Sequence, residues 1–115
     1  MTGLDYAHDR IIEIAVIVTN AQLEIIAKGP PNLVIHQPEN IMSAMNSWCI
    51  EHHGKTGLTA AVQKSTLTTR QAEVEILEFL KKFISKPKTA PLAGNSVHAD
   101  RAFLVVSLKT LFAST

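Results

Sequence analysis

The sequence is short of cysteine, of long apolar runs and of excess charge. Its single cysteine, Cys49, excludes a disulfide within one chain and is typical of a reducing compartment. No apolar run approaches the ~18 residues that a membrane-spanning helix needs. With 11 Lys and Arg against 10 Asp and Glu, the net charge is +1, which offers no basic surface for long nucleic acid. A short anionic ligand, held by a few contacts, is compatible with this balance.

Several enzyme motifs are absent as well. The chain has no GxSxG nucleophile motif, no GxxxxGK[ST] phosphate loop and no cysteine in a catalytic setting. What is present is apolar: hydrophobic residues make up 46% of the chain and charged residues 18%. This composition predicts one globular domain, and a chain of 115 residues buries about two-thirds of its unfolded surface.

The first third of the chain has the pattern of strands. Residues 10–19 are β-branched and almost continuously apolar, as in a strand that is covered on both faces. A plausible turn at 20–22, a second strand at 23–27, a break at Gly29-Pro30-Pro31 and an extended run at 33–36 follow. Together they predict an antiparallel meander over residues 11–36.

After Pro38 the apolar period becomes helical. Ile41, Met45, Trp48 and His52 recur on one face of a helix that Gly54 would end, which makes Trp48 by default a core residue. Thr68 and Gln71 form a capping box for a second helix, which runs to about Ile84. A short strand at 90–93 and a last helix from about Ala99 complete an α/β layer protein.

Carboxylates are scattered along this pattern. Glu73, Glu75 and Glu78 are expected to be solvated on the polar side of their helix. Asp100 differs, because it follows a short apolar run that stops at a glycine, in the stretch LAGNSVHADRAF. This layout suits a metal-binding carboxylate at the tip of a strand. The alternative, which composition alone favours, is an acid in the first turn of a helix, where the helix dipole stabilises it.

Five collinear segments carry a family resemblance. They are MTGLD, DRIIEIAVIVT, NLVIHQ, WCIEHHGKTGLT and APLAGNSVHADRAFL. In this order they resemble oligoribonuclease, the small 3′→5′ exoribonuclease of the DEDD-type, ribonuclease-H-like superfamily. The resemblance predicts a partial exonuclease domain at 1–104 and a divergent tail at 105–115. It implies a mixed sheet flanked by helices, a two-metal site for Mg²⁺ or Mn²⁺, and hydrolysis of RNA oligonucleotides as short as dinucleotides.

The resemblance also implies roles for single residues. Asp100 corresponds to the third of the family's four acidic metal ligands. Leu4 corresponds to a wedge between the two bases of a dinucleotide, and Trp48 and His53 to the lining of a base pocket. Ser96 corresponds to a hydroxyl that helps to cap the 5′-phosphate of the substrate. Stacking on such side chains tolerates any base and contributes ~1–3 kcal/mol per base.

The family's other catalytic motifs do not occur in this sequence. An Asp-x-Glu motif directly precedes Met-Thr-Gly-Leu in the family, and a His and an Asp follow several dozen residues after residue 115. The resemblance therefore implies truncation at both ends, loss of three acidic ligands and of the general-base histidine, and negligible turnover by this chain alone. It also implies that the sheet lacks the central strand between 11–19 and 90–93, which would expose two strand edges.

Three departures and two alternatives accompany this interpretation. Ala102 replaces a usual second arginine, Pro30-Pro31 resembles one extra residue in a hairpin loop, and residues 105–115 leave the family pattern. The resemblance further implies that the complete enzyme is a homodimer that does not associate with a membrane. It also implies a location in the cytoplasm or in mitochondria. The alternatives are a non-catalytic paralogue, which binds short nucleotides or dimerises with a full-length relative, and an unfolded product without function.

Overall fold

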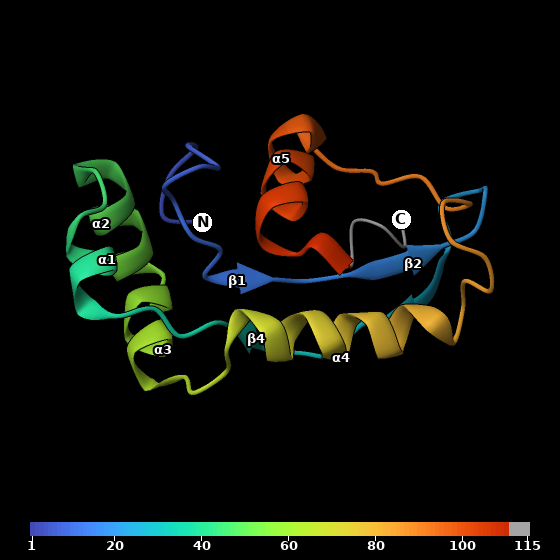
Figure 1. Ribbon diagram of the computed structural model, residues 1–115, viewed down its shortest axis with the longest axis horizontal. Helices are drawn as coiled ribbons and strands as arrows, with labels where there is room; N and C mark the ends of the chain where they lie inside the picture. The colour runs from blue at the N-terminus through green and yellow to red at the C-terminus, as the bar shows by residue number, and fades with distance from the viewer. Residues whose placement is uncertain (111–115) are drawn as a thin grey trace.

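The computed structural model describes residues 1–110, and this part of the chain forms two short antiparallel strand pairs and five helices (Figure 1). The strands are β1 (Glu13–Ile14), β2 (Ile17–Thr19), β3 (Ile25–Lys28) and β4 (Leu33–Val34). The helices are α1 (Glu39–Ser43), α2 (Ser47–Lys55), α3 (Leu58–Lys64), α4 (Thr69–Lys81) and α5 (Val97–Ser107). The expected α/β class is confirmed.

The two strand pairs are parts of one interrupted hairpin. β2 pairs with β3, and β1 pairs with β4, both antiparallel, with Ile17 opposite Lys28 and Ile14 opposite Leu33. Between these two pairings, one side of the hairpin advances three residues, from Ile14 to Ile17. The other side advances five residues, from Lys28 to Leu33, and therefore holds two additional residues. The additional residues fall around Pro30 and Pro31, which have no N–H group to donate to a strand pair.

This hairpin corrects three expectations. The strand predicted at 10–19 is interrupted and is not covered on both faces, because Glu13 and Ile17 are exposed. The meander predicted over 11–36 is one two-stranded ribbon, since the chain does not reverse direction at the Pro30-Pro31 pair. The same pair lies between β3 and β4, and not in the hairpin loop that joins β2 to β3.

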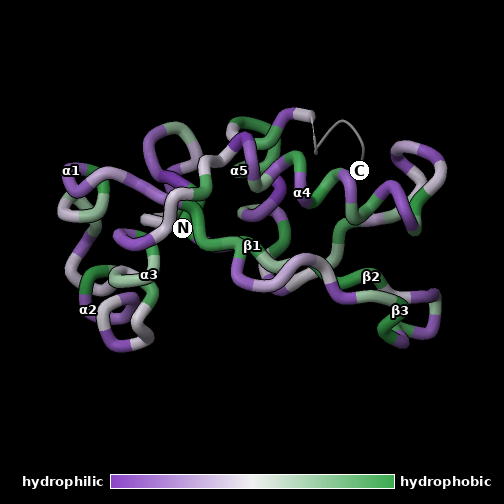
Figure 2. Tube along the Cα trace, turned by 90° about the horizontal axis from the view of Figure 1, so that it is seen from below, coloured by the Kyte–Doolittle hydropathy of each residue, from purple (hydrophilic) through white to green (hydrophobic). Residues whose placement is uncertain are grey.

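The outer end of the ribbon exposes large apolar side chains. Ile17, Leu23, Ile25 and Ile26 are each more than half exposed. In Figure 2, β2 and β3 lie at one end of the molecule, and the helices α1 to α3 lie at the other. Uncovered apolar strand edges of this kind promote association between strands of different molecules.

The main core lies where the inner end of the ribbon meets α4 and α5, which flank it in Figure 1. Its buried residues are Ile11, Leu33, Ile35, Ala72, Ile76, Leu77, Phe103, Leu104 and Leu108. A second cluster joins the ribbon to the first three helices and consists of Ile12, Met42, Met45, Cys49 and Val62. The predicted capping box fixes the start of α4, since Thr68 and Gln71 exchange both of its hydrogen bonds.

The helix predicted from Ile41 is two helices. Asn46 interrupts it, because its side-chain oxygen accepts a hydrogen bond from the Cys49 N–H (2.9 Å) and thereby caps α2. Trp48 is consequently 65% exposed, which makes the expectation of a core residue wrong. The helix passes through Gly54 and ends at Lys55, and Gly57 adopts the left-handed conformation just beyond it (φ 80°).

Two further expectations are wrong. Residues 90–93 form no strand, because no strand of the described chain lies beside them to complete a pairing, although α5 follows close to its predicted position. Glu73 is 4% exposed, not solvated. Its carboxylate accepts hydrogen bonds from the Arg70 guanidinium (2.9 Å) and from the Thr110 backbone N–H (3.2 Å), which ties α4 to the chain after α5.

Candidate functional site

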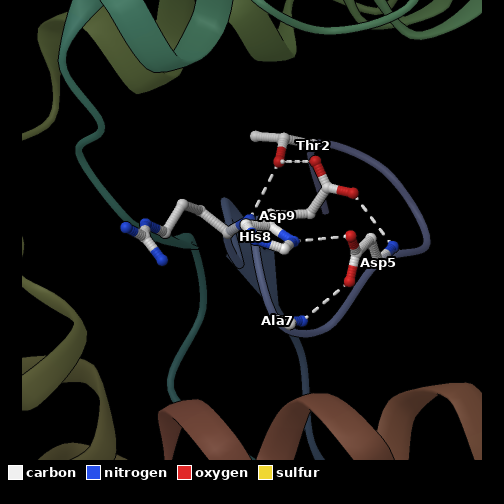
Figure 3. Close-up of polar contacts among 6 residues, drawn as sticks. Thr2, Asp5, Ala7, His8 and Asp9 are labelled. Atoms are coloured by element: carbon white, nitrogen blue, oxygen red, sulfur yellow. Dashed lines mark hydrogen bonds and ion pairs between the residues drawn. The ribbon is translucent and has the colours of Figure 1, made fainter.

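The N-terminal loop presents Leu4 to solvent. The Asp9 carboxylate accepts hydrogen bonds from the Thr2 hydroxyl and from the Asp5 backbone N–H, both at 2.9 Å (Figure 3). These contacts close the loop on either side of Leu4, whose side chain is 81% exposed. The expected wedge residue therefore lies at the tip of a closed loop. Asp9 was not among the residues expected to matter, and no sequence motif marks it.

Rings gather on α2. The Trp48 indole stacks on the His52 imidazole, with centroids 4.6 Å apart and an angle of 11° between the planes. The His53 ring lies edge-on to the indole, with centroids 6.5 Å apart. His52 was not predicted as a site residue, although its position four residues after Trp48 places both rings on one helix face. One face of the indole is therefore covered, and the other can receive a planar ligand.

The loop and the ring cluster are joined by one hydrogen bond. His53 Nε2 lies 3.2 Å from the Met1 carbonyl oxygen. Leu4 follows Met1 by three residues, a reach of at most about 11 Å even in an extended chain. The structure therefore brings three of the predicted binding residues into one neighbourhood: Leu4, Trp48 and His53. Figure 1 shows the N-terminus in this position, between α2 and α5.

Asp100 approaches the same neighbourhood from α5, and Ser96 directly precedes that helix. Asp100 lies in the first turn, and its charge acts on the Met1 amino group. Burial is the largest influence on that amine and lowers its pKa, opposed by Cys49, Glu13, Asp9 and Asp100. Ser96 precedes the helix in the left-handed conformation (φ 52°), and its exposed hydroxyl makes no capping hydrogen bond. It can therefore reach a ligand.

The described residues do not form a two-metal centre. Within residues 1–110, no group of three or more His, Cys, Asp or Glu side chains could hold a metal ion. Asp100 is the one predicted ligand. A two-metal site requires several oxygen ligands around each ion, because Mg²⁺ favours near-octahedral coordination. This part of the chain therefore does not fit the metal pair that the resemblance implies.

Comparison with known proteins places the chain in a family. The exonuclease family model matches residues 1–112, so the chain belongs to the exonuclease family, whose members are generally dependent on divalent metals. Its sequence is similar to oligoribonucleases, which confirms the resemblance seen in the five segments. Within the described residues, no helix is long and apolar enough to cross a membrane.

Three relatives illustrate the similarity. The mitochondrial oligoribonuclease of Bos taurus is 54% identical over 104 residues, which cover 90% of this chain and 43% of the relative. A probable oligoribonuclease of Dictyostelium discoideum is 50% identical over 110 residues, or 96% of this chain and 57% of the relative. The oligoribonuclease of Acinetobacter baylyi is 50% identical over 104 residues, which cover 90% of this chain and 56% of the relative. The chain thus spans about half the length of the curated relatives it matches.

The buried Met1 amine gives stability a pH dependence that can be measured. Its pKa in the folded chain lies below the ordinary value of 8.0. At pH values between the folded-state pKa and the ordinary pKa, the unfolded chain binds more protons at this amine than the folded chain does. We therefore expect the free energy of unfolding to rise with pH up to about 8.0. Urea unfolding of the free and Nα-acetylated chains at pH 6.5 and 8.5 measures it, because acetylation removes the charge. An unchanged pH dependence after acetylation would contradict the burial of this amine.

Proposed function

We propose that this protein acts in the 3′→5′ hydrolysis of very short RNA, as an oligoribonuclease, and that residues 1–110 supply its substrate-binding part. The hydrogen bond between His53 and Met1 is the observation that carries this proposal. It holds the loop with exposed Leu4 beside the helix with exposed Trp48. Two exposed apolar groups in one neighbourhood suit two successive bases, and stacking on them needs no particular sequence.

Each predicted residue has a role in this proposal. Leu4 separates the two bases, and one base stacks on the uncovered face of Trp48. His53 lines the same pocket, and the Ser96 hydroxyl donates a hydrogen bond to the 5′-phosphate. Asp100 would contribute a carboxylate to the metal centre, which no cluster of three or more metal-ligating side chains within residues 1–110 completes. A pair of Mg²⁺ or Mn²⁺ ions, when bound, would activate water and neutralise the charge of the phosphodiester.

A second candidate function is favoured by the incomplete metal centre. In this alternative the chain is a non-catalytic paralogue that binds short nucleotides, or that dimerises with a full-length relative. Binding that survives removal of all metal, together with the absence of turnover, would distinguish it from the enzyme. We also propose that the complete enzyme is a homodimer and that it lies in the cytoplasm or in mitochondria. The names of the mammalian relatives support the mitochondrial location.

Calorimetric titration with a 5′-phosphorylated diribonucleotide, in the presence of EDTA, tests the binding role. We expect the Trp48→Ala variant to bind about 5- to 150-fold more weakly than the unaltered chain, the equivalent of ~1–3 kcal/mol of stacking. Phe83→Ala is the matched control, because Phe83 is another partly exposed aromatic residue, 45% exposed, that lies just after α4. Equal binding by the two variants, or no binding by the unaltered chain, would contradict the proposed role.

A further inference from the structure

We propose that Asp9 is a positioning residue for nucleotide binding, because its carboxylate holds the loop that exposes Leu4. This inference rests on the proposed function, in which Leu4 contacts the bases. Asp9 itself touches no substrate. It acts through the backbone on either side of Leu4, and its contribution should therefore be visible only when Leu4 is present.

Both oxygens of the Asp9 carboxylate are engaged, one on each side of the loop tip (Figure 3). Oδ1 accepts a hydrogen bond from the Thr2 hydroxyl and Oδ2 accepts one from the Asp5 N–H, each 2.9 Å long. The Thr2 hydroxyl oxygen in turn accepts from the Arg10 N–H at 2.8 Å, and the Thr2 N–H donates to the Arg10 carbonyl at 2.9 Å. The residues before and after Leu4 are thus fixed to one carboxylate.

Burial strengthens the hydrogen bond between the Thr2 hydroxyl and the Asp9 carboxylate. Thr2 is 3% exposed, and Asp9 is half-buried, so water competes little for the bond between them. A hydrogen bond to an ionised carboxylate is about twice as strong as one between neutral groups. Leu4 is 81% exposed and has little packing of its own to define its place. Its position is consequently determined by the backbone, and Asp9 is the side chain that holds this backbone on both sides of Leu4.

Gly3 gives independent evidence for this packing. A Cβ atom at this position would lie 2.7 Å from the carboxyl carbon of Asp9, which is closer than atoms without a bond can approach. The carboxylate therefore lies directly against the loop backbone. Any side chain at position 3 would displace it, so Gly3→Ala should reproduce the effect of removing the Asp9 contacts without changing any charge.

A neighbouring ion pair provides the matched control. Asp5 and His8 form a contact of 2.8 Å in the same loop, with side chains that are 57% and 84% exposed. Exposed pairs of this kind contribute little to order. His8→Ala removes this contact and leaves both Asp9 hydrogen bonds in place. It is expected to bind nucleotides as the unaltered chain does.

Calorimetric binding of a 5′-phosphorylated diribonucleotide and of a 5′-mononucleotide tests the inference. Asp9→Asn removes one acceptor, and we expect the dinucleotide to bind about 10- to 150-fold more weakly, as for the loss of one hydrogen bond to a charged group. Mononucleotide binding should not change, because there is no second base to separate. The double variant Leu4→Ala with Asp9→Asn should bind no more weakly than Leu4→Ala alone. Additive effects of the two substitutions would overturn the positioning role.

A second measurement needs no ligand. We expect the ¹⁵N order parameters at Leu4 and Asp5 to fall from ~0.85 toward ~0.6 or below in Asp9→Asn, and to stay unchanged at Ala72 in the core. A loop that remains ordered without the carboxylate overturns the inference. If the loop loosens but the unaltered chain binds no dinucleotide, the proposed function fails, and the positioning role fails with it. Loosening together with non-additive binding supports both.

Discussion

The purified 115-residue chain, given a 5′-phosphorylated diribonucleotide with Mg²⁺ or Mn²⁺, is expected to release mononucleotides no faster than its Asp100→Asn variant. Residues 1–110 contain no cluster of three metal-ligating side chains, so we expect them not to hold a pair of ions by themselves. The family resemblance also predicts that the general base is missing, and such a base typically contributes about 10²- to 10⁴-fold to a rate. Loss of the metal pair adds to this, because both the attacking and the leaving oxygen lose their stabilisation.

Separation of the products by chromatography measures this rate directly. The oligoribonuclease of Acinetobacter baylyi is a suitable positive control, since 104 of its residues align with this chain at 50% identity. Metal-dependent turnover that disappears in Asp100→Asn would contradict the expectation. In that case other carboxylates of the chain, or those of a second copy, must complete the site. Binding without turnover would leave the substrate-binding role as the activity of this chain.

Phe103→Ala is expected to cause the largest loss of stability among single substitutions. Phe103 is 1% exposed and lies in the core where α5 meets α4 and the ribbon. Truncation of a buried phenylalanine typically lowers the free energy of unfolding by ~3–5 kcal/mol. A small domain has only ~5–15 kcal/mol in total. Because α5 also carries Asp100, its loosening would displace that carboxylate together with Ser96.

Urea unfolding followed by circular dichroism at 222 nm measures this loss. Phe83→Ala is the control, because Phe83 is 45% exposed and outside the core clusters. Its substitution should change the free energy of unfolding by less than ~1 kcal/mol. Equal losses from the two substitutions would mean that α5 does not pack in this way.

Elements that depend on neighbouring residues in the chain were predictable from the sequence. The capping box of Thr68 and Gln71 marks the start of α4, and the apolar residues that follow it face the core. The start of α5 was predicted within two residues of Val97. Both depend on hydrogen bonds and periodicity within a few positions, which is the information that a sequence displays directly.

Elements that depend on a distant partner were not predictable. The break of the ribbon at Pro30-Pro31 depends on which strand lies opposite. Residues 90–93 form no strand because no strand within residues 1–110 pairs with them. In the candidate site, the five predicted residues came from the family resemblance. Asp9 was missed because its role depends on a closed loop that no sequence motif marks. His52 was missed although its spacing from Trp48 indicates a shared helix face, because that spacing does not show that the two rings stack.

Trp48 is the only tryptophan of the chain, and it lies exposed in the ring cluster of α2. All indole fluorescence of the protein therefore originates at the proposed base-binding surface. The His52 ring, 4.6 Å away, lies close enough to quench it, so a change in that stack would alter the emission. A base that stacks on the open face would shift both intensity and wavelength. The fluorescence of Trp48 can therefore report the binding of a nucleotide at this surface in real time, without an added label.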